Sequence, residues 1–489
     1  MTTTTVAPPI QRPFRLLPAL YRWHRRIGLC AAVAVLVWAC SGLSHPIMTR
    51  LFPSAVAMQP PASDAAPGGL PLAEAMARAG IAELTGARLI GWQDRPYWQV
   101  RRPGEHEWRY VDAADGRLVA DGDARYAEML ARHYSGEQAA AVRRATLVTA
   151  FDGDYAAINR LLPVWRIEFE RPDGLRVYVE TAPARLAALM DDRKAVFQAL
   201  FGLLHRWEWL DGAPLLRRLL MSVLLLSAAG AAGLGLVLAW RRPRGGRGTP
   251  LRTWHRRLGL LVLGSTFAFT LSGVFHVWAA PDFDPPLRRE ARFDTATATV
   301  PPQRLALGAT LVAIDGRAAW WLPPAPIVAG DEHAAHAGHA MPAGATAAAR
   351  VLDAASGAVL ADGERRLAAV IAAELAGLPL QKLREATPVT RFDGEYGFVS
   401  KRLPVLRLSY DLPGRPNAYV EPASGVLAAR PQPLARIESA AFSWLHKAQW
   451  LDGLGKGPRD TLLGLFALLN GGLAVIGLLL WLRRARRPA

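Results

Sequence analysis

Six of the eleven histidines in the chain form three matched pairs that lie at the ends of apolar segments. Imidazole is the commonest metal ligand among side chains, and an ionisable group inside an apolar segment is costly unless it faces a partner or a ligand. Two neutral imidazoles without cysteine suit the iron of haem b, whereas zinc normally adds Cys, Asp or Glu at coordination spacing. The sequence therefore predicts haem b, with six candidate ligands, namely His24, His45, His205, His255, His276 and His446.

The pairing of these histidines is open at the level of sequence. Six ligands allow one to three haem groups, and we expect two. Either His45 meets His276, or each of these meets one of His205 and His446. A haem between His24 and His255 would complete an electron path across a membrane, although these two also suit simple solvation among neighbouring arginines. Covalent haem attachment is excluded, because the sequence contains no C-x-x-C-H.

A small residue lies on the same helical face one turn from each of the six histidines. Such positions leave a gap that suits a flat macrocycle, and they serve tight packing between helices equally well. The set comprises Gly28, Gly42, Gly202, Gly259, Gly273 and Ser443.

Four apolar segments are long enough to cross the ~30 Å hydrocarbon core of a bilayer as helices. These predicted transmembrane helices cover residues 27–49, 217–240, 258–280 and 460–482. His24 and His45 are 21 residues apart, which is about 32 Å along a helix and within about 60° of the same face. One helix can therefore present a histidine at each surface of the membrane.

The basic charge of the chain is concentrated beside the predicted helices. The formal net charge is +17, and arginines supply sixteen of these charges in residues 1–26, 241–257 and 483–489. Positive segments beside membrane helices stay in the cytoplasm, so we expect residues 50–200 and 281–445 in the periplasm, with the protein in a bacterial inner (cytoplasmic) membrane. Nucleic acid is not an expected partner. A protein that binds nucleic acid gathers its basic residues on one folded face, whereas these arginines lie in three short segments.

The sequence contains an internal duplication. Residues 21–47 align without gaps with residues 252–278 and share W-H-R-R and S-G-x-x-H, and residues 145–155 match 386–396 around F-D-G-[DE]-Y. W-L-D-G recurs in the segments 201–216 and 446–459, which we place at the membrane interface. The chain is therefore predicted to consist of two tandem copies of helix, external domain and helix, related by an axis along the membrane normal.

Each external segment combines helical and strand patterns. A helical stretch at 72–80 precedes strands with alternating apolar residues, and R-P-D-G at 171–174 marks a hairpin turn. The repeated F-D-G-[DE]-Y is typical of a turn, although its acidic and tyrosine side chains also suit a substrate surface. The predicted fold class is an α+β membrane protein with four transmembrane helices and small antiparallel sheets covered by helices.

A histidine-rich insert at 331–341 occurs in the second half only. It contains HAAHAGHAM, in which three imidazoles and a thioether have a spacing that can wrap around a transition metal such as copper or iron. A flexible Ala/Gly loop with incidental histidines is the alternative. The candidate metal ligands are His333, His336, His339 and Met341.

At several of these motifs the chain resembles the PepSY-associated transmembrane family. The resemblance rests on W-H-R-R-x-G-L followed by S-G-x-x-H, on YVDAADGRLV at 110–119 and RVLDAASGAVL at 350–360, and on L-H-[RK], and it covers nearly the whole chain. It implies PepSY-like α+β periplasmic domains and a link to iron acquisition. Some members of this family resemble haem-containing reductases of ferric siderophores, which implies a reductase activity here.

The expected function is therefore a haem b reductase that passes electrons to a periplasmic ferric chelate, with a ferric siderophore as the favoured substrate. No nicotinamide or flavin fingerprint is present, so electrons would come from a membrane quinol or a cytoplasmic reductase. The alternatives are a non-enzymatic PepSY membrane module that binds a peptide, protein or chelate, and a periplasmic protein that handles copper.

The histidine-rich insert gives a first prediction. If HAAHAGHAM binds metal, deletion of residues 331–341 should lower the amount of copper or iron that the purified protein retains after dialysis, measured by elemental analysis. An unchanged metal content in the deletion variant would contradict a metal-binding role for the insert.

Overall fold

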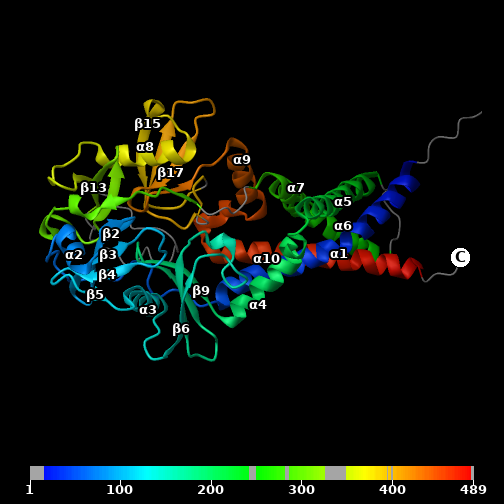
Figure 1. Cartoon of the computed structure of the whole chain (residues 1–489). Helices are drawn as coiled ribbons and strands as arrows, with labels where there is room; N and C mark the ends of the chain where they lie inside the picture. Colours follow the sequence, from blue (N-terminus) through cyan, green and yellow to red (C-terminus); the bar gives the residue numbers. More distant parts are fainter. Residues whose placement is uncertain are drawn as a thin grey trace, which may run out of the picture. The chain divides into compact units, whose positions relative to one another are not determined.

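The computed structural model of the chain describes residues 16–241, 249–280, 286–324, 349–393, 395–397 and 400–485. It is 49% helical and 21% strand. The chain forms two compact units, each built from both halves of the sequence (Figure 1). The helical unit consists of Met1–Arg50, Gln198–Ala280 and Glu438–Ala489, and the sheet unit consists of Leu51–Phe197 and Pro281–Ile437.

Long apolar helices make up the helical unit. Three of them contain a stretch long and apolar enough to cross a membrane, with mean hydropathy of 2.1, 2.1 and 2.2. These are α1 (Leu16–Leu51), α5 (Pro214–Arg241) and α10 (Lys456–Ala485). A fourth candidate span consists of α6 (Pro250–Leu261) and α7 (Leu263–Ala279). The protein is therefore a multi-pass membrane protein.

The fourth candidate span is broken where the sequence predicts one continuous helix over 258–280. The axes of α6 and α7 meet at 59°, with Val262 between them. The hydroxyls of Ser265 and Thr266 each donate to the carbonyl oxygen of Val262 at 2.9 Å. Thr266 also contacts Asn470 of α10 at 2.7 Å. Side-chain donors that compete for a helix carbonyl are a recognised cause of bends, and they satisfy the backbone where the helix opens.

Two short π-helical segments enter the helical unit at equivalent points of the two halves. The first, η2 (Gly202–Arg206), follows α4 (Asp192–Phe201), and the second, η10 (Phe442–His446), follows α9 (Pro433–Ala441). Each carries one of the predicted histidine ligands, His205 or His446. The wider turn of a π-helix is uncommon and occurs frequently at functional sites.

A seven-stranded antiparallel sheet joins the two halves of the sheet unit. Its strand order is β14-β13-β12-β2-β3-β4-β5, and β12 pairs with β2 through Thr310 and Arg88. Alternating apolar residues in these strands contribute to three cores. The bounds are β2 (Gly86–Trp92), β3 (Arg95–Arg101), β4 (Arg109–Asp112), β5 (Leu118–Val119), β12 (Thr310–Ile314), β13 (Arg317–Leu322) and β14 (Arg350–Asp353).

Two smaller antiparallel sheets complete this unit. The four-stranded sheet has the order β6-β7-β8-β9, and the five-stranded sheet has the order β10-β18-β17-β16-β15. Their strands are β6 (Val142–Val148), β7 (Val164–Phe169), β8 (Arg176–Glu180), β9 (Arg185–Met190), β10 (Leu287–Arg288), β15 (Leu383–Val389), β16 (Val405–Tyr410), β17 (Asn417–Glu421) and β18 (Val426–Ala429). The short strands β1 (Glu83–Leu84) and β11 (Phe293–Asp294) pair with each other.

One helix packs between sheets in each half. Apolar residues of α3 (Gly122–Ser135) share a core with β2, β3 and the four-stranded sheet, and those of α8 (Gly363–Ala376) share a core with β12, β13 and the five-stranded sheet. A third helix, α2 (Leu72–Ala79), covers the other face of the seven-stranded sheet. The external segments thus contain antiparallel sheets covered by helices.

The F-D-G-[DE]-Y motifs form turns, which confirms the turn interpretation. In each motif the aspartate, Asp152 or Asp393, accepts hydrogen bonds from two backbone N–H groups that follow it. The buried tyrosine hydroxyls then donate to backbone oxygens, Tyr155 to Leu161 at 2.9 Å and Tyr396 to Arg402 at 2.8 Å. The second motif therefore fixes the backbone of a buried arginine.

Arg402 connects the two halves through buried charges. Its guanidinium donates to Glu421 at 2.6 Å and lies 3.4 Å from Glu180, and these glutamates end the sequence-matched strands β17 and β8. Arg185 pairs with the same two carboxylates. Burial opposes the charge of Arg402, but the two carboxylates outweigh it and raise its pKa. A buried charge is tolerable only when it is paired in this way.

The Arg402 network gives a second prediction. Replacing Arg402 with Ala removes one buried ion pair from each of two glutamates, and loss of one partner of a buried pair costs about 3–5 kcal/mol. We expect a clearly lower unfolding temperature for Arg402→Ala in detergent. The matched control is Arg143→Ala, because Arg143 forms an ion pair with Glu168 while 57% exposed. Equal unfolding temperatures for the two variants would contradict the stabilising role of the buried network.

Candidate functional site

His24 and His255 lie next to each other in the helical unit, on α1 and α6. Their ring centroids are 6.2 Å apart and the ring planes are inclined at 70°. The Nδ1 atom of His24 is 2.9 Å from the backbone oxygen of Ala231 on α5. A carbonyl oxygen only accepts hydrogen bonds, so Nδ1 carries the proton and the lone pair of His24 is on Nε2.

Two glycines allow these imidazoles to lie close to neighbouring helices. A Cβ atom on Gly235 of α5 would lie 3.2 Å from Cε1 of His24, and one on Gly477 of α10 would lie 3.4 Å from Cε1 of His255. Both distances are short for contacts of a Cβ atom. Each ring therefore packs against the backbone of a different span, that of His24 against α5 and that of His255 against α10.

His205 and His446 form the second pair of the helical unit. Their ring centroids are 6.5 Å apart and the planes are inclined at 83°. Nδ1 of His205 is 3.0 Å from the hydroxyl of Ser41, which itself donates to the oxygen of Trp38. Because that hydroxyl has its single proton engaged, it accepts from Nδ1–H and leaves the lone pair of His205 on Nε2.

The same serine arrangement recurs at His446. Nδ1 of His446 is 3.2 Å from the hydroxyl of Ser272, and this hydroxyl donates to the oxygen of Ala268 at 2.5 Å. Desolvation is the main cause that lowers the pKa of His446 to about 3, and electrostatic interactions with His205, His276 and Lys447 act in the same direction. His446 is therefore neutral at physiological pH and has the lone pair that a ligand needs.

His276 adjoins this second pair through an aromatic stack. Its ring stacks on Phe442 at 4.0 Å between centroids, and Phe442 stacks on His446 at 4.4 Å. Nδ1 of His276 is 2.6 Å from the buried carboxylate of Glu438, which places the remaining nitrogen, Nε2, away from the carboxylate. A carboxylate on Nδ1 is the usual support of a metal-ligating histidine.

The spacing of both pairs fits ligation of one metal ion by two imidazoles. An imidazole nitrogen lies about 1.1 Å from its ring centroid and bonds a metal at about 2 Å, so two opposed ligands have centroids roughly 6.3 Å apart. The observed values are 6.2 and 6.5 Å. The described residues contain no group of three or more His, Cys, Asp and Glu that could hold a metal ion. Two imidazoles at this separation would fit the iron of a haem group.

The structure brings together some of the predicted ligands and adds a pair that the sequence did not suggest. His24 lies beside His255 as expected, whereas His205 meets His446 directly, which was not among the predicted pairings. His45 lies within α1, but its side chain is outside the described residues. The histidine-rich insert, with His333, His336, His339 and Met341, also lies outside them.

The small residues near the histidines mostly serve packing between helices. A Cβ atom on Gly28 would lie 3.9 Å from Ala231 of α5, and one on Gly259 would lie 3.7 Å from Leu473 of α10. Gly273 similarly faces Leu225 of α5 at 3.3 Å. These contacts are the close helix approach that glycine permits.

Several supporting residues were missed by the sequence analysis. Ser41 and Ser272 are the serines of the repeated S-G-x-x-H, so their recurrence was a visible signal. Gly235 and Gly477 occupy matching places in α5 and α10 but resemble many other glycines of apolar helices. Glu438 was not singled out in the sequence analysis, because it belongs to none of the repeated motifs.

A family comparison agrees with this architecture. The model of the PepSY-associated TM region matches residues 21–484. The chain belongs to this family. No curated protein was found to match the chain. The family match covers all five described histidines of the site.

The contact between Gly235 and His24 gives a third prediction. Alanine in place of Gly235 adds a methyl group 3.2 Å from the imidazole, and overpacking costs about 1–3 kcal/mol. Alanine in place of Gly230, whose nearest neighbour is Ile27 at 3.9 Å, is the control. We expect Gly235→Ala to unfold at a lower temperature than Gly230→Ala in detergent. The reverse order would show that His24 does not occupy this position.

Proposed function

We propose that this membrane protein is a haem b reductase that passes electrons across a bacterial inner membrane to a ferric chelate, with a ferric siderophore as the favoured substrate. The observation that carries the proposal is the geometry of two histidine pairs. Both have the separation expected for axial ligands of one iron, and hydrogen bonds place the lone pair of His24, His205 and His446 on Nε2.

The two pairs are separated along the helices. Ser41, which contacts His205, lies 17 residues after His24 in α1, and this corresponds to about 26 Å of helix. That length is close to the ~30 Å of a hydrocarbon core. Two haem groups at these levels would therefore lie near opposite surfaces of the membrane, as transfer across the bilayer requires.

The residues of the chain would hold and orient the proposed haem groups. His24 and His255 would bind one, and His205 and His446 would bind the other, with His276 beside the second pair. The carbonyl of Ala231 and the hydroxyls of Ser41 and Ser272 fix the orientation of the rings. Bound haem supplies reversible one-electron transfer. Addition of one electron converts Fe(III) to Fe(II), which hard oxygen ligands hold less tightly.

The orientation in the membrane is part of the proposal. The arginine-rich ends of the spans support cytoplasmic termini and periplasmic external domains. Sequence-matched elements support two copies of one repeat, since β7 and β16, and likewise β8 and β17, begin and end at a constant offset of 241 residues. The electron donor would be a membrane quinol or a cytoplasmic reductase.

Haem content gives the fourth prediction. The protein purified from cells supplied with haem should show a b-type reduced-minus-oxidised spectrum, and a pyridine haemochrome assay should give about two haem groups per chain. His24→Ala and His446→Ala should each remove about one haem, because each variant loses an axial ligand.

A matched control separates ligation from general damage to the protein. His133 lies in the sheet unit, where it contacts the oxygen of Gln59 at 2.9 Å, so His133→Ala should retain full haem content. A colourless wild-type protein would contradict the reductase and favour a binding module. Unchanged haem content in both ligand variants would contradict these ligand assignments.

A further inference from the structure

A large cavity with a positive lining lies within the sheet unit. Its volume is about 930 Å³, and residues from both halves of the chain line it. Cavities of this size hold organic ligands. The described lining residues include seven arginines and only four acidic residues, so the lining carries an excess of positive charge.

The two central carboxylates of the cavity already have cationic partners. Glu421 pairs with Arg402 and Arg185, and Glu180 pairs with both of these and with Arg288. These five groups alone leave one uncompensated positive charge. Further arginines of the lining therefore cannot be neutralised by Glu180 and Glu421.

Two more arginines of the lining bind only neutral oxygens. Arg88 donates to the backbone oxygen of Ala182, and Arg101 donates to the hydroxyl of Thr85 at 3.3 Å. Neither forms an ion pair within the described part of the chain, and Nε of Arg88 is buried without a hydrogen-bond partner there. Glu421 acts on Arg88 and Glu290 acts on Arg101 without a direct ion pair in the described residues. A buried cation that lacks a paired carboxylate is costly, so this arrangement is suited to an anion from solution.

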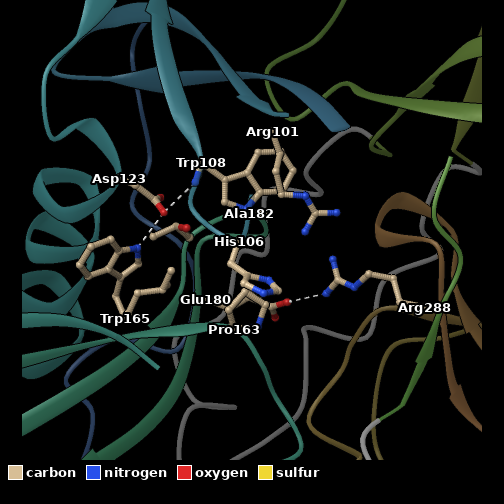
Figure 2. Close-up of a pocket in the computed structure, with 11 residues that line it drawn as sticks. Arg101, His106, Trp108, Asp123, Pro163, Trp165, Glu180, Ala182 and Arg288 are labelled. Atoms are coloured by element: carbon tan, nitrogen blue, oxygen red, sulfur yellow. Dashed lines mark hydrogen bonds and ion pairs between the residues drawn. The ribbon is translucent and has the colours of Figure 1, made fainter. Parts of the chain in front are cut away.

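Two arginines of the cavity lining, Arg101 and Arg288, also line a smaller pocket that shares several residues with the cavity. Figure 2 shows this smaller pocket, with the guanidinium groups of both arginines directed into it and Glu180 paired with Arg288 at its edge. Burial is the main cause that lowers the pKa of Arg288 to about 10; the charges of Arg402 and Arg101 act in the same direction, and those of Glu180 and Glu421 oppose them.

We propose that this cavity binds a polycarboxylate chelate of ferric iron, which makes the substrate of the reductase an anion. The claim that the chelated metal is iron rests on the proposed function, whereas the claim that the cavity binds a polycarboxylate does not. Guanidinium groups bind carboxylates with paired, charge-assisted hydrogen bonds. The volume exceeds what a small inorganic anion needs, and Trp108, Phe293 and Trp321 offer apolar surface for an organic ligand.

Calorimetry on the full-length protein in detergent tests this inference without electron transfer. The probes are ferric citrate, iron-free citrate, inorganic phosphate and a cationic ferric trihydroxamate. We expect ferric citrate to bind most tightly, and its affinity to fall as sodium chloride is raised, because salt screens charge. Tighter binding of the trihydroxamate, or of phosphate, would overturn the inference.

Variants then locate the site. Arg101→Gln and Arg288→Gln should each weaken ferric citrate binding by about tenfold to a hundredfold, the loss expected for one charge-assisted contact. Arg143→Gln, which removes an exposed charge from the same unit, should bind as the wild type does. Unchanged affinity in both cavity variants, with normal unfolding temperatures, would overturn the assignment. A colourless protein that still binds ferric citrate through Arg101 and Arg288 would refute the reductase alone.

Discussion

The helical unit depends on one constraint, namely that polar groups in a membrane must find their hydrogen-bond partners within the protein. Every bond described above for an imidazole of this unit uses Nδ1. The acceptors are a backbone carbonyl for His24, serine hydroxyls for His205 and His446, and a carboxylate for His276. In the proposed function, this choice uses Nδ1 for hydrogen bonding within the protein and reserves Nε2 for the haem iron.

The same constraint explains the shape of the helices around the site. The broken span at Val262 is tolerated because Ser265 and Thr266 satisfy its carbonyl, and Asn470 of α10 bonds to the same two hydroxyl groups. Glycines bring the helices into close contact, which compensates for the absence of a hydrophobic driving force between helices in lipid. The histidines are thus held by a rigid arrangement of helices rather than by loops.

Charge has the corresponding role in the sheet unit. Glu180 and Glu421 end matched strands, and Arg402 with Arg185 binds both, so complementary ions add to the contact that the shared sheet makes between the halves. The duplication does not include Arg402. At the offset of 241 residues, the matching position in the first half is Leu161.

The sequence by itself determined the composition of the membrane helices, the family and the candidate ligands, because these depend on local hydropathy and on motifs that recur in the chain. It also indicated the turns at F-D-G-[DE]-Y, since Asp-Gly acts on its own backbone. Tertiary structure decided which histidines meet. His205 and His446 are 241 residues apart, and only the packing of the π-helical segments brings them together. The sheet shared by β2 and β12 and the arginine-lined cavity likewise depend on contacts between distant segments, which hydropathy and local motifs do not encode.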